Sequence, residues 1–306
     1  MVAYRVEHET RYRYEARVST SEHVAYLRPR ELPRQRVCRH DLLVDPPPAR
    51  SSRRTDYFGN DVEQFTVLTP HAELLVRARS FVEVDAPPPL DLDHSPPWEE
   101  VRDAFVYEKG RTSGEPAQFA YPSPYVSFDP DLAEFARASF AAGRPLLDAA
   151  LDLMRRIHAE FRFDPKATTI TTPVKRVFLE RRGVCQDLAH LQIACLRSLG
   201  LSARYVSGYL LTDPPPGQPR LVGADASHAW LSVHCPRHGF VDLDPTNGVL
   251  ASARHVTLAW GRDFGDVSPL RGVILGGAEH SLRVAVSVVP VAADEWRRLP
   301  SEVTVG

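Results

Sequence analysis

Hydrophobic and polar residues alternate through the first 85 residues of the chain. Tyr4 and Val6 are separated by one polar residue, and Tyr12 and Tyr14 repeat the same period of two. Such alternation is typical of strands with one buried face. The segment 56–61, Asp-Tyr-Phe-Gly-Asn-Asp, is a turn signal between two such stretches. The pattern therefore predicts an N-terminal β-sandwich-like domain built from short strands.

The middle of the chain changes to apolar positions spaced by three and four residues, as in amphipathic helices. Asp129 is a capping residue placed before Pro130, which fits the first position of a helix. Pro145 opens a second, longer helix. A third, short helix is expected to stop near Gly183, and a fourth to begin at about Cys185.

The rest of the chain returns to strand patterns. Strands are predicted at 204–211, 228–234, 239–243 and 281–291, with a proline-rich loop at 214–219 after the first of them. Five prolines within residues 86–97 indicate a stiff linker. We therefore expect an α+β protein in four parts: an N-terminal β domain at 1–90, a linker and helical segment at 91–144, a core at 145–265, and C-terminal strands at 266–306 that return to the N-terminal sheet.

Composition and charge exclude several classes of protein. The 306 residues are 43% hydrophobic and 25% charged, which is ordinary for a globular chain. The net charge of -2 argues against broad binding to nucleic acid. The N-terminus has no apolar segment of the kind found in a signal peptide, and the most apolar tract, 284–293, is far shorter than a membrane span, so we expect a cytoplasmic protein without membrane contact. Four cysteines in a chain of this length are too few for a disulfide framework.

Cys185 lies at the expected start of a helix, two residues after Gly183. The unpaired N–H groups and the dipole of a helix N-terminus favour an anion, and the thiolate is the reactive form of cysteine. The same N–H groups can hold the oxyanion that forms when a carbonyl carbon is attacked. An inert core cysteine lies more often on the apolar face in the middle of a helix, as Cys195 does. The position of Cys185 therefore indicates a nucleophile.

A histidine and an aspartate complete the chemistry. His228 follows Cys185 by 43 residues and lies in a predicted strand, and Asp244 follows His228 by 16 residues at the end of the next strand. Two strands joined by a short loop form a hairpin, which can bring both side chains together on one face. His228 can then take the thiol proton as general base, while Asp244 fixes the tautomer and orientation of the ring.

The segment 183–190, Gly-Val-Cys-Gln-Asp-Leu-Ala-His, together with Ser-His-Ala-Trp at 227–230 and Asp-Pro-Thr-Asn at 244–247, resembles the transglutaminase-like core. The β-rich N-terminus and the tail at 259–272 resemble a bacterial subgroup of that family, so the resemblance covers nearly the whole chain. It implies a papain-like fold in which a helix-borne cysteine packs on an antiparallel sheet.

The resemblance also implies an activity and the roles of residues. Cys185 would be the nucleophile, His228 the base and then the acid, and Asp244 the residue that orients His228. The reaction would be acyl transfer on a peptide, protein or amide carbonyl through a thioester, ended by hydrolysis or transamidation. Gln186 and Trp230 are the candidates for contact with substrate. The backbone N–H of Cys185 is expected as one oxyanion donor, with the second unassigned.

Other interpretations of the same residues stay open. A non-catalytic binding module could retain this fold, because fold does not dictate function. A zinc enzyme could use Cys185 and His228, but no further ligand stands at a suitable spacing. His234, Cys235 and His238 share one turn, at spacings that zinc sites lack. We therefore expect no metal and no other cofactor.

Overall fold

The computed structural model describes residues 1–92, 94–106, 114–212 and 227–298, so the proline-rich loop predicted at 214–219 lies outside the described residues. The helices are α1 (Trp98–Asp103), η1 (Glu115–Ala120), α2 (Pro130–Arg137), α3 (Leu146–Glu160), α4 (Val174–Glu180), α5 (Cys185–Ser198), η2 (Phe264–Asp266) and α6 (Glu295–Arg298). Every helix in these ranges is too short or too polar to cross a lipid bilayer.

Local sequence explains where the helices begin and end. The Asp129 carboxylate accepts hydrogen bonds from the backbone N–H groups of Asp131 (2.8 Å) and Leu132 (3.4 Å), which confirms the predicted cap of α2. The stop predicted near Gly183 is confirmed. Helix α4 ends at Glu180, and its C-cap residue Arg181 has the left-handed φ of 53°.

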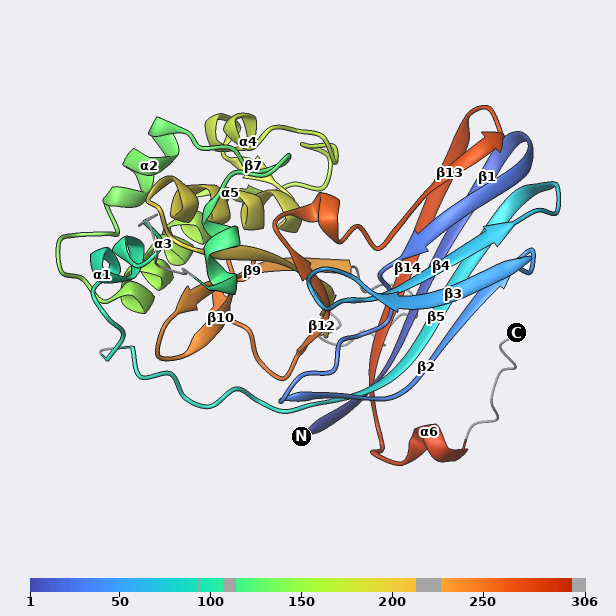
Figure 1. Ribbon diagram of the computed structural model, residues 1–306, viewed down its shortest axis with the longest axis horizontal. Helices are drawn as coiled ribbons and strands as arrows, with labels where there is room; N and C mark the ends of the chain where they lie inside the picture. The colour runs from blue at the N-terminus through green and yellow to red at the C-terminus, as the bar shows by residue number, and fades with distance from the viewer. Residues whose placement is uncertain (93, 107–113, 213–226, 299–306) are drawn as a thin grey trace, which may run out of the picture.

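A five-stranded antiparallel sheet forms the centre of the core (Figure 1). Its strands, in spatial order, are β11 (Val249–Leu250), β10 (Gly239–Asp244), β9 (Ser227–Cys235), β8 (Ala203–Leu210) and β12 (His255–Gly261). Helix α5 packs on β8 and β9, with α2, α3 and α4 around it. A short parallel pair, β6 (Arg162–Phe163) and β7 (Arg182–Gly183), precedes α5.

The N-terminal strands form one curled, seven-stranded sheet around β1. Its members are β1 (Val2–Ala25), β2 (Gln35–Asp45), β3 (Arg50–Thr55), β4 (Asp61–Val67), β5 (His71–Val84), β13 (Leu270–Gly276) and β14 (His280–Val291). The first half of β1 pairs with β5 and β14, and its second half pairs with β4 and β13. The prediction of short strands is therefore wrong for β1, which runs for 24 residues.

Side-chain amides attach the N-terminal domain to β12, the edge strand of the core sheet. Gln35 donates to the Thr257 carbonyl at 2.7 Å and accepts from the Thr257 N–H at 2.8 Å. Asn60 makes the same pair of bonds with the backbone of Trp260, at 2.9 and 3.0 Å. Because an edge strand otherwise exposes unpaired backbone groups, these amides cover the edge as a further strand would.

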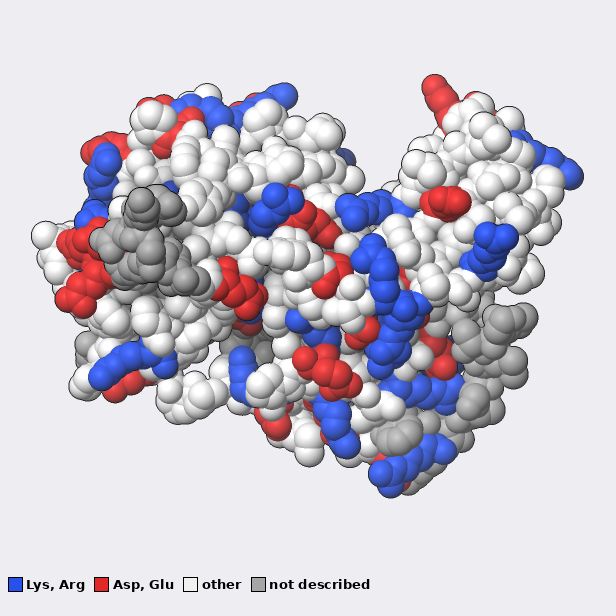
Figure 2. Space-filling view, in the orientation of Figure 1, with Lys and Arg blue, Asp and Glu red and all other residues white. Residues whose placement is uncertain are grey.

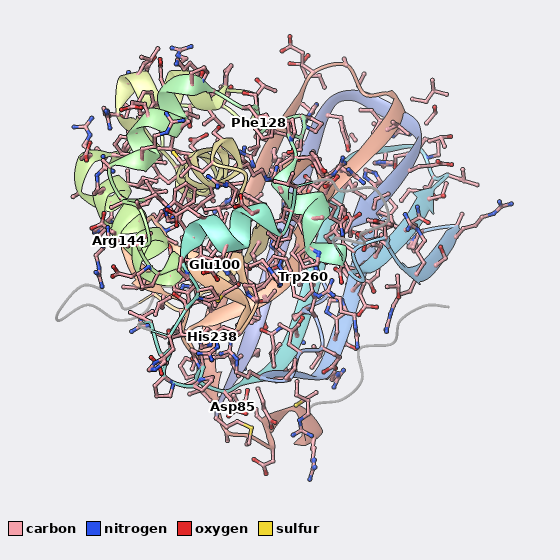
Figure 3. The ribbon with its side chains drawn as sticks, turned by 60° about the vertical axis from the view of Figure 1, so that its left-hand side comes forward. Asp85, Glu100, Phe128, Arg144, His238 and Trp260 are labelled. Atoms are coloured by element: carbon pink, nitrogen blue, oxygen red, sulfur yellow. The ribbon has the colours of Figure 1, made fainter. Side chains whose placement is uncertain are left out.

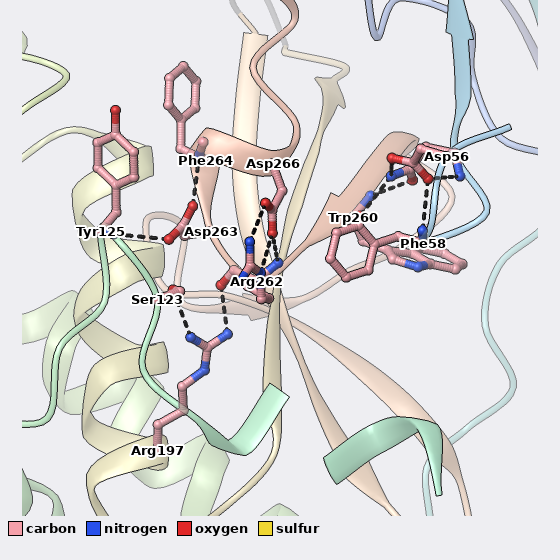
Figure 4. Close-up of polar contacts among 12 residues, drawn as sticks. Asp56, Phe58, Ser123, Tyr125, Arg197, Trp260, Arg262, Asp263, Phe264 and Asp266 are labelled. Carbon is pink, nitrogen blue, oxygen red and sulfur yellow. Dashed lines mark hydrogen bonds and ion pairs between the residues drawn. The ribbon is translucent and has the colours of Figure 1, made fainter. Parts of the chain in front are cut away.

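The figures place this junction in the molecule. Trp260 lies where the core meets the N-terminal sheet (Figure 3). On the core side, the buried Arg197 guanidinium bonds the carbonyl of Arg262 and the hydroxyl of Ser123, while Arg262 pairs with Asp266 at 2.9 Å (Figure 4). The surface is hollowed between the core and the far end of the N-terminal sheet (Figure 2).

Candidate active site

The N-terminus of α5 is held in place by a buried carboxylate. Asp187 accepts the Val184 N–H at 2.8 Å and the Thr168 hydroxyl at 2.6 Å, which ties the helix to the preceding loop. Burial raises the pKa of Asp187 above its usual value. A Cβ on residue 183 would lie 2.8 Å from the Asp187 side chain, so glycine is needed there for space. Cys185 is the first residue of α5 and is partly exposed.

His228 and Asp244 come from neighbouring strands of the core sheet. His228 is the second residue of β9, and Asp244 is the last residue of β10, which pairs with β9. His228 Nε2 lies 2.7 Å from Asp244 Oδ2. His228 is 9% exposed and Asp244 is fully buried, so solvent screens their interaction little.

The charges of the pair support one another. Burial lowers the pKa of His228, but hydrogen bonds to Asp244 and Cys185 outweigh that effect and raise the pKa to about 10. Burial raises the pKa of Asp244, yet its hydrogen bonds to His228 and His255 hold that pKa well below the usual range. Because Nε2 faces Asp244, Nδ1 is the ring nitrogen left for the Cys185 thiol. The arrangement can hold a protonated imidazole beside the sulfur.

The turn after β10 saturates the Asp244 carboxylate with donors. Oδ1 accepts the backbone N–H groups of Thr246 at 3.0 Å and Asn247 at 3.2 Å, and Oδ2 accepts the Asn247 side-chain amide at 2.7 Å. This is the local hydrogen bonding expected of an aspartate before a turn. It fixes the carboxylate so that one oxygen points at His228.

The structure adds a residue that the sequence analysis missed. His255, the first residue of β12, lies with Nε2 3.2 Å from Asp244 Oδ2. Its Nδ1 accepts the Ser252 N–H at 3.1 Å, which places the ring proton on Nε2. His255 is therefore a neutral donor to Asp244. The alternation of Val256, Thr257 and Leu258 is the signal that could have indicated this strand.

The three side chains could also be considered as a metal site. His228, Asp244 and His255 form a group of potential ligands whose atoms lie within 4.8 Å of one another among the described residues. Two ligand atoms each about 2.0 Å from a tetrahedral zinc stand about 3.3 Å apart, whereas His228 and Asp244 are in contact at 2.7 Å. His255 also carries its proton on the nitrogen that would bind the ion. Mutual hydrogen bonds explain this group better than a metal does.

The two candidates for substrate contact have different surroundings. The Gln186 side chain is partly exposed beside Cys185 and donates to the Ile170 carbonyl at 3.2 Å. Trp230 is fully buried, with its ring centre 6.0 Å from that of His228 and 5.2 Å from that of His255. Trp230 therefore packs against both histidines and limits the space in which their rings can move.

This combination of fold and site defines the class of the protein. Residues 133–245, which include Cys185, His228 and Asp244, match the model of the transglutaminase-like superfamily. Residues 4–83 match the bacterial transglutaminase-like N-terminal region. Two mycobacterial proteins without a described function, from Mycobacterium tuberculosis and Mycobacterium bovis, are each 43% identical over 95% of this chain and 94% of their own length. The chain belongs to the bacterial transglutaminase-like family.

Two further comparisons describe more distant proteins. A protein-glutamine gamma-glutamyltransferase of Pseudomonas aeruginosa is 30% identical over 123 residues, which are 34% of this chain and 18% of that protein. The crystal structure of a candidate cysteine protease from Cytophaga hutchinsonii superposes with a TM-score of 0.73 at 18% identity, over 95% of this chain and 91% of the other. The second comparison establishes the shared fold across both domains.

Proposed function

We propose that the protein is a cysteine-dependent acyltransferase that attacks amide carbonyls and passes through a thioester. One observation carries the proposal: the buried His228–Asp244 pair, at 2.7 Å, adjoins a cysteine at the first residue of a helix. Each member has a distinct role. Cys185 is the nucleophile, His228 moves the proton, and Asp244 holds the ring in place.

Acylation begins when the Cys185 sulfur attacks the carbonyl carbon of the amide. The carbonyl oxygen becomes an oxyanion, which the backbone N–H of Cys185 and the α5 dipole stabilise. The C–N bond then breaks, and the proton on His228 Nδ1 passes to the departing nitrogen. Ammonia or an amine leaves, and the acyl group remains on sulfur as a thioester.

Deacylation reverses these roles. His228, now neutral, removes a proton from water or from an amine, which attacks the thioester carbonyl. The C–S bond then breaks and Cys185 leaves as a thiolate, while His228 keeps the proton that it removed. Water thus gives a carboxylic acid, and an amine gives a new amide. The partial likeness to a protein-glutamine gamma-glutamyltransferase favours the glutamine side-chain amide as the first acyl donor to test.

Trapping the thioester tests this proposal. The protein is incubated with a glutamine-containing peptide library and a biotin-tagged primary amine, and products are analysed by mass spectrometry. Tagged peptides indicate transamidation, and a 1 Da gain per glutamine indicates hydrolysis to glutamate. The Cys185→Ala variant must form neither product, whereas Cys38→Ala must form whichever product the wild type forms, at the wild-type rate.

The same experiment separates the enzyme from a binding module. A protein that captures peptides without converting them, and whose Cys185 acquires no acyl adduct, would contradict the proposed activity. An adduct found on Cys38 instead of Cys185 would contradict the assignment of the nucleophile.

A further inference from the structure

A cavity of about 280 Å³ lies at the junction of the two domains, away from Cys185. The core sheet contributes Val206, His255 and Trp260 to its wall, and the N-terminal domain contributes the segment 32–35 and Val84. The wall combines apolar and aromatic side chains with a few polar groups, which is the usual composition of a small-molecule site.

A buried arginine supplies the polar end of this cavity. Arg204 is 8% exposed, and its guanidinium lies 3.6 Å from the ring centre of Trp260 and 3.9 Å from that of Phe240. Its Nε contacts the Ser232 hydroxyl at 3.4 Å, and that hydroxyl is held in turn by Asp242. Its two terminal nitrogens bond no described residue. Because the rings of Trp260 and Phe240 cover the two faces of the planar guanidinium, only its edge is available to a ligand.

The positive charge at this site is incompletely balanced. Arg30 lies 3.5 Å from the same Trp260 ring as Arg204, so the two guanidiniums occupy opposite faces of the indole. Within the described residues, neither arginine has a carboxylate at ion-pair distance. Burial lowers the pKa of each to about 10, against the opposing influence of more distant carboxylates. An anion in the cavity would relieve the cost of burying this charge.

We propose that the cavity binds a small carboxylate with an apolar body, such as a short aromatic or aliphatic acid. The carboxylate would pair with the edge of Arg204, since a guanidinium edge matches the two oxygens of a carboxylate. The exposed Arg34 lines the rim and adds a second positive charge, while Asp242 is the one acid among the described lining residues. The apolar body would contact Val206 and Phe240.

The site is separate from the nucleophile but touches the triad. His255 lines the cavity and donates to Asp244, so a bound acid would lie behind the catalytic carboxylate. Binding there does not depend on the proposed acyl transfer. Failure of one proposal therefore leaves the other standing.

Calorimetry with sodium benzoate tests the site directly. The titration uses the full chain with Cys185 blocked by iodoacetamide, at constant ionic strength set with sodium chloride. We expect saturable binding of benzoate with a Kd on the order of a millimolar, as suits a small ligand. Benzyl alcohol lacks the negative charge and should bind at least about tenfold more weakly, because it cannot form the charge-assisted hydrogen bonds to Arg204.

Three variants locate the binding. Arg204→Met should weaken benzoate binding by about tenfold or more, and Ser252→Phe, an exposed lining position, should block the cavity while leaving Arg204 intact. Arg50→Gln, exposed on β3, is the matched control and should bind as the wild type does. If Arg204→Met does not fold, the affinity of Ser252→Phe for benzoate tests the proposal by itself. Absence of saturable binding, or wild-type affinity in a folded Arg204→Met or in Ser252→Phe, would overturn the proposal.

Discussion

His255 and His228 contact the same oxygen of Asp244, at 3.2 and 2.7 Å. Through this shared oxygen, His255 can act on the imidazole of His228 by way of the carboxylate. We expect His255→Phe to lower kcat/KM by roughly tenfold, the common effect of losing one hydrogen bond to a buried charged group. His255→Gln, which keeps a donor, should recover part of the loss. Steady-state kinetics of both variants, with a substrate identified in the thioester-trapping experiment, measures these effects.

A double-mutant cycle distinguishes this positioning role from general destabilisation. In the Asp244→Ala background the carboxylate is gone, so His255→Phe should cost little further activity. Equal losses in both backgrounds would mean that His255 acts by another route. The melting temperature of each variant, measured in parallel, identifies effects that come from the fold.

The raised pKa of His228 predicts how activity falls at high pH. His228 must be protonated to release the leaving amine, so kcat/KM for acylation should decline on the alkaline side with a midpoint near pH 10. Asp244→Asn replaces the charged partner by a neutral one, which lowers the pKa of His228. The alkaline midpoint should therefore move to lower pH, and the rate should fall by up to about 10⁴-fold, as in other triads.

The pH profile also has a control. Asp103→Asn changes an exposed carboxylate on α1 that pairs with Arg102, and should leave the midpoint in place. An unchanged midpoint in Asp244→Asn would show that the alkaline decline in activity does not come from the titration of His228.

The four thiols should differ in their reaction with iodoacetamide. Cys185 is partly exposed beside a protonated imidazole and should react first at pH 7. Burial raises the pKa of Cys195 to about 12 and raises that of Cys38, so both should react slowly, and Cys235 is inaccessible. Peptide mapping by mass spectrometry after timed quenching gives the four rates. Labelling of Cys38 at the rate of Cys185 would contradict the prediction that His228 activates the Cys185 thiol.

Local patterns were enough to predict much of the core, because its helices and hairpin are built from neighbouring residues. The cap at Asp129 and the strands on either side of the turn at Cys235 are local features, and the structure has them as expected. The pairing of Val6 with Val288 is not local. Nothing near either residue specifies its partner, so the curled sheet around β1 could not be predicted in detail.

The parts of the site that sequence analysis missed depend on tertiary burial. Arginine is usually exposed, and Arg204 is buried only because two aromatic rings enclose its guanidinium. His255 follows a turn in a segment with few strand residues before it, and its role exists only because β12 passes near the end of β10. Charged and polar residues of this kind are assigned by their neighbours rather than by their own preference.

The support beneath Cys185 can be tested at Gly183. A methyl group there would meet the Asp187 side chain at 2.8 Å and displace the carboxylate from the Val184 N–H. We expect Gly183→Ala to destabilise the protein by about 1–3 kcal/mol and to slow the alkylation of Cys185. Asp187→Ala removes the same cap without crowding and should cost about 1 kcal/mol. Urea unfolding followed by circular dichroism compares the two, and equal stability of Gly183→Ala and wild type would show that the helix start tolerates the crowding.

Gly208 offers the corresponding test on the histidine side. It pairs across the sheet with His228, and a Cβ there would lie 2.3 Å from the Trp230 ring and from the Val256 carbonyl oxygen. Neither a backbone carbonyl nor a fully buried indole can give way by that amount, so Gly208→Ala must shift β12 or Trp230. Either movement changes the position of His228 or His255 relative to Asp244. We therefore expect a loss of at least about 2 kcal/mol in the free energy of unfolding and a fall in kcat/KM greater than that of His255→Phe.

Gly239→Ala is the control for a glycine replacement in this sheet, because Gly239 is a hairpin glycine with open space around its Cβ position. Its positive φ of 69° should make the alanine cost stability without affecting the alkylation rate of Cys185. If Gly208→Ala keeps wild-type kinetics, the close packing of Trp230 against the two histidines has no part in holding them.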